Sequence, residues 1–423
     1  MAHSLTLLDA RTPEELDTVA DVARSLSPGP MPVAGPAGLT VAALIAWQDG
    51  RANQGPALLE RAIALADRTA RGAGRAFPRL ALAAMLTGLG RLDEADRLLD
   101  SCQLFVAEEP DRRWRATPTI FRSRVQLLGG HIDDAVASAR AGIDHAQRGA
   151  CEFVPLAWLT IAAAALDHDD LAGAAAAVAR YRDAPPPPRA GVGWATYAWV
   201  HARIVGARDG AHAAFESLRV IYDDMDAHQQ LLLEVPAAAG DLIRLALSEG
   251  DATRARAVAT RAARLADANP DVRSLAAAVA HARGILLGDV DLLEVAVTRH
   301  PHPWARASAA EDAGAVLLDR RAARASHGFL DRALDEYERA GAVRDAARVR
   351  ARLRDIGVRR QHGRRQRRSI EGWDSLTDAE RRVAEVVAEG LTNRRPAGGC
   401  SCRVTRSTST SARSSASWGS RHG

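Results

Sequence analysis

A repeat with a period close to 40 residues runs through most of the chain, and it constrains the fold more than any other feature. In each copy an apolar helical stretch ends at glycine or aspartate, a short polar turn follows, and a new amphipathic stretch begins. The turn residues are Gly50, Gly90, Gly130, Asp169, Gly210, Gly250 and Gly288, at intervals of 40, 40, 39, 41, 40 and 38 residues. Two helices of about 15 residues with two turns need this length, so the repeat predicts a stack of helical hairpins.

The residues at these turns indicate how each hairpin reverses. Glycine lacks a Cβ atom and accepts the positive φ at which a helix commonly ends. Acidic residues follow one to four positions later, as in GLGRLDEA around Gly90 and LLGGHIDDA around Gly130. Near the start of the next helix, these carboxylates interact favourably with the helix dipole. We therefore expect left-handed turns at the repeat positions, each followed by a new helix.

Composition agrees with an all-α fold. Hydrophobic residues make up 47% of the chain but aromatic residues only 4%, which favours closely packed helices over a sheet sandwich. The period exceeds the roughly 34 residues of a regular tetratricopeptide repeat, and the signature aromatics are mostly missing, so the chain resembles a degenerate tetratricopeptide-like array. We predict an all-α, tetratricopeptide-like α-solenoid over residues 36–356. Its concave face would bind an unknown effector or protein partner.

Several kinds of catalytic chemistry are excluded by residues that the chain lacks. All 56 basic residues are arginine, so neither a lysine phosphate loop nor a Schiff base is possible. The sequence also has no G-x-S-x-G elbow and no H-E-x-x-H motif. His300-Pro301-His302 could suggest a metal site, but no acid or cysteine stands nearby at ligand spacing, and the prolines indicate a loop. We expect no enzyme activity, no catalytic residue, no cofactor and no metal.

Charge and cysteine usage indicate a cytoplasmic protein. The net charge is +4, but residues 396–423 contain four arginines and no acid, so the rest of the chain is balanced. Cys102 and Cys151 fit buried thiols in a reducing compartment better than a disulfide framework. The chain has no charged-then-apolar leader and no apolar run long enough to cross a membrane. We predict a cytoplasmic location without membrane contact.

Beyond the repeats, residues 373–395 contain the start of a second helical unit. Thr377 and Glu380 have the T-x-x-E spacing of a capping box. Three valines at helical spacing then form an apolar stripe, namely Val383, Val386 and Val387. Gly390 stands where this helix would end, and Thr392 or Asn393 can cap a second helix directly afterwards. Such a short helix, tight turn and new helix start are the opening of a helix-turn-helix unit.

This stretch resembles the first half of a LuxR-type DNA-binding domain, as found at the C-terminal end of large ATP-binding-type regulators. The matching residues are Leu376, Thr377, Glu380, Val383, Ala388, Glu389, Gly390, Thr392, Asn393 and Arg394. The resemblance implies a transcription regulator whose helical array senses a ligand or partner, and which pairs as a homodimer through its DNA-binding domain. It also implies phosphate contacts from Thr392, Asn393 and Arg394, near the start of the scaffold helix.

The family pattern stops after Arg395. Residues 396–423 are rich in serine and arginine and have no apolar periodicity, so we expect a disordered tail. If one base was lost near codons 395–398, the codons of residues 400–411 permit L-F-V-S-R-H-T-V-D-F-H-L in the shifted frame. Those of residues 414–419 permit F-R-K-L-G, which continues the family's recognition helix. We predict an out-of-frame recognition helix and impaired sequence-specific DNA binding.

Two other segments flank these domains. Residues 1–35 are predicted to be a leader helix and loop, and residues 357–372 a basic linker. Four linker arginines could add nonspecific contacts to DNA phosphates, namely Arg364, Arg365, Arg367 and Arg368. A solvated hinge that touches nothing is an equally good interpretation of the linker.

Two functions follow from the sequence. The first is a LuxR-type transcriptional regulator whose DNA binding is weak or lost in this chain. The alternative is a non-enzymatic helical-repeat scaffold that binds a protein or small-molecule partner.

Overall fold

The computed structural model describes residues 35–107, 113–146, 151, 153–183 and 194–357. This part of the chain folds into nineteen α-helices, α3 to α21, and contains no β-strand. The prediction of an all-α array of helical hairpins is therefore confirmed. None of these helices is both long enough and apolar enough to cross a lipid bilayer. The cytoplasmic location stays a prediction.

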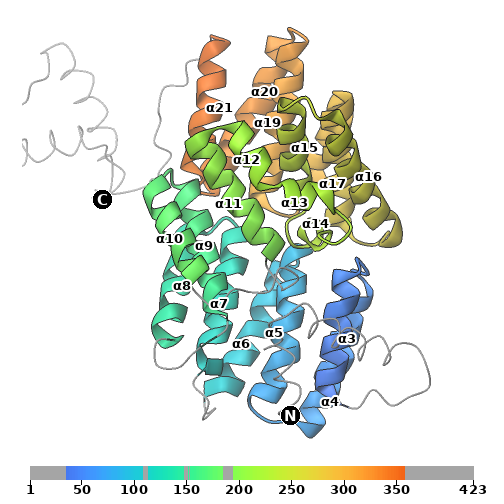
Figure 1. The fold of residues 1–423 in the computed structure, drawn as a ribbon, viewed down its shortest axis with the longest axis vertical. Helices are drawn as coiled ribbons and strands as arrows, with labels where there is room; N and C mark the ends of the chain where they lie inside the picture. Colours follow the sequence, from blue (N-terminus) through green and yellow to red (C-terminus); the bar gives the residue numbers. More distant parts are fainter. Residues whose placement is uncertain (1–34, 108–112, 147–150, 152, 184–193, 358–423) are drawn as a thin grey trace, which may run out of the picture. The chain divides into compact units, whose positions relative to one another are not determined.

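The helices form two tiers joined by a connecting segment (Figure 1). The lower tier consists of α3 (Pro36–Gln48), α4 (Gln54–Thr69), α5 (Ala73–Gly88), α6 (Leu92–Ala107), α7 (Arg113–Leu128), α8 (Ile132–Ala146), α9 (Val154–Asp167) and α10 (Leu171–Asp183). The connecting helices are α11 (Trp194–Asp209), α12 (Ala211–Ser217), α13 (Arg219–Asp223) and α14 (Gln230–Glu234). The upper tier consists of α15 (Ala238–Ser248), α16 (Ala252–Ala268), α17 (Arg273–Leu287), α18 (Val290–Arg299), α19 (Pro303–Asp319), α20 (Ala323–Arg339) and α21 (Val343–Asp355).

The predicted turn residues reverse the chain in the expected way. All seven have positive φ, from 63° at Gly288 to 94° at Gly210. Asp169 is the non-glycine member of the set, with φ of 65°. Acids lie in the first turn of the next helix in α6, α8 and α18, whereas α4, α10, α12 and α16 have none there, so this expectation holds for only part of the array. The repeat signal in the sequence thus reported the hairpin turns correctly.

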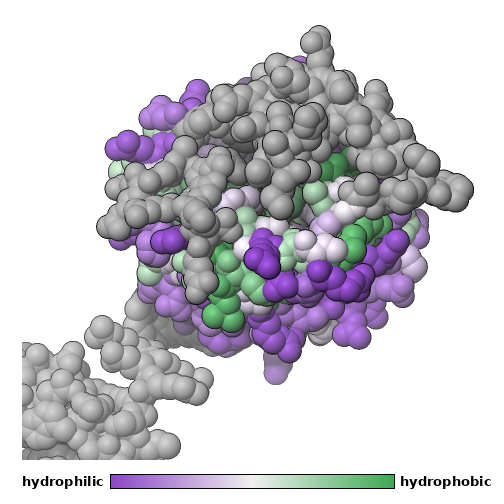
Figure 2. Space-filling view, turned by 90° about the horizontal axis from the view of Figure 1, so that it is seen from below, coloured by the Kyte–Doolittle hydropathy of each residue, from purple (hydrophilic) through white to green (hydrophobic). Residues whose placement is uncertain are grey.

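Within a lower-tier hairpin, the first helix is the more deeply buried. The helix α5 buries eleven of its sixteen residues, whereas α6 buries four. The helix α9 likewise buries nine of fourteen residues, and α10 buries four of thirteen. The second helices therefore have one apolar stripe and an otherwise polar surface, as an outer helix needs. In the coloured part of Figure 2, hydrophilic side chains lie toward the outside of the face and apolar side chains lie between them.

The turns of the lower tier fit directly against the upper tier. A Cβ atom added to Gly90 would lie 2.3 Å from Cβ of Pro301, and one added to Gly50 would lie 2.5 Å from Cδ2 of Leu265. These glycines therefore serve two purposes, since they adopt a positive φ and also leave room for a neighbour that approaches their backbone. At Gly90 a side chain would need the Pro301 ring to shift, and at Gly50 it would need the ends of Leu265 and Gln229 to move.

The next two turns of the row continue the same joint. At Gly130, an added Cβ atom would lie 3.2 Å from Cα of Ala340. Asp169, the fourth turn residue, forms an ion pair with Arg344 at 2.5 Å. Four successive repeats thus place their turns in one row, which contacts α16, the start of α19 and the α20–α21 hairpin. We call this row the turn row.

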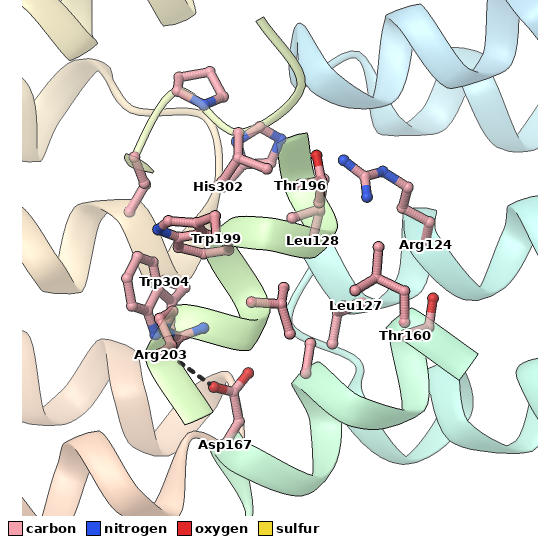
Figure 3. A pocket seen from close by; sticks show the side chains of 17 residues that line it. Arg124, Leu127, Leu128, Thr160, Asp167, Thr196, Trp199, Arg203, His302 and Trp304 are labelled. Carbon is pink, nitrogen blue, oxygen red and sulfur yellow. Dashed lines mark hydrogen bonds and ion pairs between the residues drawn. The ribbon is translucent and has the colours of Figure 1, made fainter. Parts of the chain in front are cut away.

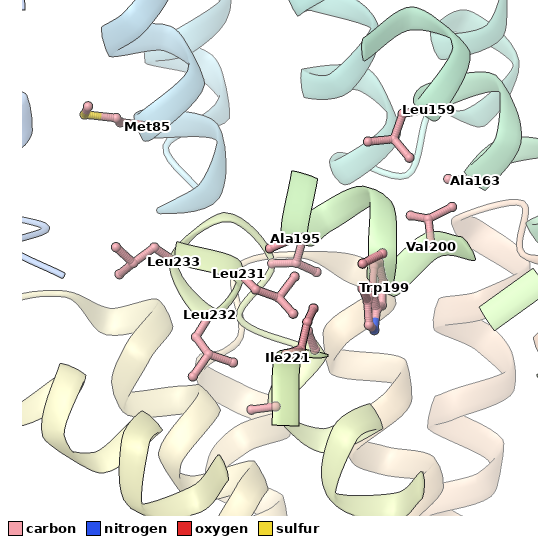
Figure 4. Packing of buried hydrophobic residues seen from close by; sticks show 14 of the residues in the cluster. Met85, Leu159, Ala163, Ala195, Trp199, Val200, Ile221, Leu231, Leu232 and Leu233 are labelled. Carbon is pink, nitrogen blue, oxygen red and sulfur yellow. The ribbon is translucent and has the colours of Figure 1, made fainter. Parts of the chain in front are cut away.

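The connecting segment departs from the repeat. The sequence indicates two long helices per period, but residues 211–234 instead form three short helices. Leu231, Leu232 and Leu233 in α14 are all fully buried, although consecutive positions cannot share one helix face. Figure 4 shows this leucine segment among side chains from several elements, including Met85 of α5. The segment is covered on all sides because it runs between the tiers, so the array is folded back on itself and its inner face is occupied.

The remaining predicted segments lie beyond the described residues. The helices belong to the first of two units, Met1–Val358, and the second unit is Arg359–Gly423. Apart from Gly35 and Gly357, the leader, basic linker, partial helix-turn-helix and tail are all outside the described ranges. Their boundaries stay predictions.

Two glycine substitutions test the turn row. Gly250→Ala should cost about 1–2 kcal/mol of unfolding free energy, because its φ of 75° disfavours a side chain but no atom lies within 4 Å of the new Cβ. Gly90→Ala should cost about 1–3 kcal/mol more, because the new methyl group overlaps Pro301. Urea unfolding followed by the helical circular dichroism signal measures both losses. Equal losses would show that the turn and Pro301 separate freely.

Candidate ligand pocket between the two tiers

A pocket lies where α7 and α9 of the lower tier meet α11 and the start of α19 (Figure 3). The pocket is small, because the centre of a water-sized sphere can reach only about 70 Å³ of it. Its lining residues are Arg124, Leu127, Leu128, Leu159, Thr160, Ala163, Asp167, Thr196, Trp199, Val200, Arg203, Val235, Pro236, Ala237, His302, Trp304 and Ala305. The lining is mainly apolar, with a few charged groups at defined places, which is the usual character of a small-molecule site.

Arg203 is held at one wall of the pocket by two indole rings. Its guanidinium carbon lies 4.6 Å from the ring centroid of Trp304 and 5.0 Å from that of Trp199. The two indoles meet edge to face, with centroids 6.1 Å apart. Trp199 and Arg203 are four residues apart on α11, so they share one helix face. A planar guanidinium stacks well on such rings, and the arrangement fixes the direction of its N–H groups.

Two carboxylates share this arginine. Arg203 Nη2 lies 3.2 Å from Asp167 Oδ1 and 3.6 Å from Asp345 Oδ2. Burial raises the pKa of Asp167 to about 6, and Asp345 adds to the rise while Arg203 opposes it. Burial also favours the neutral form of Asp345, but Arg348, Arg203 and the indole of Trp304 outweigh it and lower its pKa. Asp345 is therefore the more firmly ionised of the two carboxylates.

Both pocket indoles are also fixed by hydrogen bonds to carboxylates. Trp304 Nε1 donates to Asp345 Oδ2 at 2.7 Å, and Trp199 Nε1 donates to Asp241 Oδ2 at 3.2 Å. A buried indole N–H needs such a partner, and here each partner is charged. The wall that contains Trp199 and Trp304 is thus held in position before any ligand enters.

A larger network of charges lies behind this wall in the upper tier. Arg348 donates two hydrogen bonds of 2.7 Å to Glu311 and another of 2.6 Å to Asp345. Glu311 also accepts from the buried hydroxyl of Tyr337 at 3.0 Å. Through Asp345, this network reaches both Trp304 and Arg203. The pocket wall is therefore connected by ion pairs to α21, the last described helix.

Arg124 stands at the other end of the pocket, opposite Asp167 (Figure 3). Its side chain is 21% exposed, and its Nη2 lies 3.8 Å from Glu234 Oε2 and 3.4 Å from the Glu234 carbonyl oxygen. Both distances are long for a charge-assisted hydrogen bond. Glu234 also accepts a hydrogen bond from the hydroxyl of Thr196. Burial lowers the pKa of Arg124, and Glu234 compensates only in part.

His302 closes the pocket beside Arg124. Its Nε2 donates a hydrogen bond of 3.0 Å to the carbonyl oxygen of Thr87, which fixes the tautomer with a proton on Nε2. Burial lowers the pKa of His302 to about 4, and the bond to Thr87 opposes this shift. His302 is therefore neutral at pH 7. It connects the start of α19 to the end of α5.

The residues that suggested a metal site lie in the predicted loop. His300 ends α18, His302 precedes α19, and both side chains are buried. No group of three or more His, Cys, Asp or Glu side chains in the described ranges is arranged to hold a metal ion.

Cys102 is buried as expected, and burial raises the pKa of its thiol to about 12. Cys151 is half-buried rather than buried, because it lies in the segment before α9.

The residues predicted to contact DNA lie outside the described part of the chain. They are Thr392, Asn393 and Arg394 in the partial helix-turn-helix, and Arg364, Arg365, Arg367 and Arg368 in the linker. Their roles stay predictions.

The pocket residues themselves were not singled out from the sequence. Two signals could have indicated them. One is the spacing W-x-x-x-R at Trp199 and Arg203, in a chain with few aromatic residues. The other is the presence of charged residues on first helices, namely Arg124 on α7 and Asp167 at the end of the otherwise largely apolar α9. Neither signal shows that the four side chains meet.

Comparisons with known proteins found structural similarity but no sequence family. No protein-family model matches the chain, and no curated protein sequence matches it. One similar solved structure is the Rap protein complexed with competence and sporulation factor, with a TM-score of 0.43 and 10% identity, covering 76% of this chain and 97% of that one. Another is the TPR domain of P58(IPK), with a TM-score of 0.23 and 13% identity, covering 85% of this chain and 98% of that one. At such scores neither likeness bears on what this chain binds, and the fold assignment rests on its own helices.

The buried His302 predicts a dependence of stability on pH. The unfolded chain binds a proton at this residue below about pH 6.5, whereas the folded chain excludes it until about pH 4. The stabilisation is therefore complete above pH 6.5 and is lost as the pH falls toward 4, by on the order of 3 kcal/mol. Urea unfolding should show a smaller loss between pH 7 and pH 4 for His302→Gln than for the wild type. The exposed His145→Gln variant should behave like the wild type, and an unchanged loss in His302→Gln would contradict the prediction.

Proposed function

We propose that residues 35–357 form a receptor scaffold that binds a partner in the pocket between the tiers. One observation carries the proposal, namely that the pocket wall is fixed in advance by ion pairs and by hydrogen bonds from two indoles. Preorganised walls of this kind reduce the ordering cost of binding. The proposed role is binding without catalysis. This role needs none of the catalytic motifs that the sequence lacks.

The position of the pocket supports a receptor role. Leu127 and Leu128 come from α7 of the lower tier, whereas Trp304 comes from α19 of the upper tier. A bound partner would contact both tiers and the connecting helix α11 at once. Its binding free energy would therefore stabilise the joint between them. The partner is a small molecule or a short protein segment that fits this space.

We also propose a second role, in which this receptor belongs to a LuxR-type transcriptional regulator. The specific support is the sequence pattern of residues 376–395, which continues in a shifted reading frame beyond codon 396. In this proposal, the present chain keeps the sensing array and has lost most of its sequence-specific DNA binding. Pairing as a homodimer through the DNA-binding domain belongs to the same proposal.

A pocket-filling variant tests the receptor role. Leu128 lines the pocket and is half-buried, so Leu128→Trp should fill the pocket without disturbing the core. In a fragment screen by ligand-observed NMR and thermal shift, wild-type binders should fail to bind this variant. At a hundredfold excess over Kd, a binder should stabilise the wild type by about 2.7 kcal/mol, a shift of several degrees. Leu247→Trp is the matched control, because Leu247 is 38% exposed and does not line the pocket. A screen without pocket binders would refute the role.

Restoration of one base near codon 396 tests the regulator role. In gel shifts at physiological salt, the restored protein should bind the upstream region of its own gene at least about 10³-fold more tightly than unrelated DNA. The present chain should show no such preference. Its residual binding should weaken when Arg364, Arg365, Arg367 and Arg368 are all changed to glutamine, because that binding depends on phosphates. Specific nanomolar binding by the present chain would contradict the predicted impairment.

A further inference from the structure

Arg124 provides the pocket with a cation that its protein neighbours do not fully engage. Some other partly buried arginines have close carboxylate partners, such as Arg79, whose Nη2 lies 2.8 Å from both oxygens of Asp67. Arg124 makes no contact closer than 3.4 Å with the carbonyl or carboxylate oxygens of Glu234. Figure 3 shows its guanidinium at one end of the pocket, next to Thr196. A guanidinium has five N–H donors, so most of those of Arg124 remain available to a ligand.

Two carboxylates near the indole wall, those of Asp167 and Asp345, are more fully engaged than Arg124. Asp167 faces Arg203 at 3.2 Å, and Asp345 accepts from Arg348 and Trp304 at 2.6 and 2.7 Å. A cationic ligand would have to displace one of these partners. An anionic ligand displaces none of them, because it meets Arg124 at an unfilled side. The geometry therefore favours an anion.

The charge and the lining limit which anion fits. Arg203 is already shared by two carboxylates, so Arg124 is the one pocket cation among the described residues with spare capacity. A single guanidinium balances a singly charged carboxylate and matches its two oxygens in a fork geometry. A phosphate with two charges would need more positive charge, and Glu234 would repel it more strongly than it repels a carboxylate. Between Arg124 and the indole wall the lining is aliphatic, as with Leu127 and Leu159, so the rest of the ligand is apolar.

We infer that the pocket binds a monocarboxylate with an apolar body, whose carboxylate pairs with Arg124 and whose body lies between α7, α9 and Trp199. The inference rests on the proposed receptor role and adds the chemical class of the ligand. Two sources have this chemistry, namely a free apolar carboxylic acid and the C-terminus of a peptide with an apolar last residue. Both place one carboxylate beside one aliphatic group.

Matched acid and amide probes test the inference. The first pair is N-acetyl-leucine and its amide, and the second is a pentapeptide that ends in leucine with a free or an amidated C-terminus. In calorimetric or NMR titrations with the full chain, the acid of at least one pair should bind about 10- to 100-fold more tightly than its amide. A preference for the acid in the N-acetyl-leucine pair indicates a free acid as the ligand. A preference for the free C-terminus in the pentapeptide pair indicates a peptide end.

Variants of Arg124 assign the preference to this residue. Arg124→Gln should reduce the acid-to-amide ratio to near one, and Arg124→Lys should keep part of it, because lysine retains the charge without the fork. Arg122→Gln is the matched control, since Arg122 lies on the same helix, pairs with Asp96 and Asp100, and does not line the pocket. If Arg124→Gln does not fold, Arg124→Lys decides the test. Its acid-to-amide affinity ratio should then be lower than that of the wild type.

Two results overturn the inference and leave the receptor role intact. One is equal binding of acids and amides, or an unchanged ratio in the Arg124 variants. The other is absence of probe binding while fragments still bind the wild type and not Leu128→Trp. If neither probes nor fragments bind, the receptor role fails as well, so the two failures are distinguishable.

Discussion

The close contact between the turn row and the upper tier is the constraint on which the rest of this structure depends. Gly90 allows Pro301 to approach its backbone directly, and the turns one period before and one period after it make similar contacts. Because the repeat length is nearly constant, these turns come at regular steps and together form a surface on which a second tier can dock. An open solenoid would leave its inner face free for a partner. Here the upper tier and the leucine segment of α14 occupy that face, so the space for a ligand is reduced to the pocket at the joint.

The charges at this joint contribute positioning more than stability. Removal of an arginine and a carboxylate from water is costly, and a well-packed apolar pair is often as stable as a buried ion pair. The network around Arg203 and Asp345 nevertheless continues from α9 through α11 to α21. Its evident physical effect is to hold two indoles and one guanidinium in fixed directions around a cavity. The desolvation cost is therefore understandable if the cavity has to be ready for a ligand, and is harder to explain if the joint only has to be stable.

Local signals in the sequence determine the hairpins but not the way in which the tiers meet. The turn positions were predictable because a left-handed turn and a helix start each depend on adjacent residues, as at Gly130. The contact of Gly90 with Pro301 joins residues more than two hundred positions apart, and nothing near either residue encodes it. The break into short helices before Leu231 has the same origin, since burial on all sides overrides the repeat. The pocket depends on these long-range contacts, so Arg124 could be recognised as unusual only once its neighbours were known.

One carboxylate of the last described helix, α21, pairs with both the indole wall and Arg203 of the pocket, and this shapes how a ligand could act at a distance. Asp345 on α21 accepts from Trp304 at 2.7 Å and from Arg348 at 2.6 Å, and Arg203 lies 3.6 Å away. Any ligand that moves the indole or Arg203 must change the partners of Asp345. A ligand transmits a signal only if it favours one of two arrangements. Asp345 lies between Arg203 and Arg348, and a closer pairing with one or the other would give two such arrangements. In a regulator, this exchange would be the physical start of a signal toward the C-terminal side, whereas in a scaffold the same contacts would only keep the wall rigid.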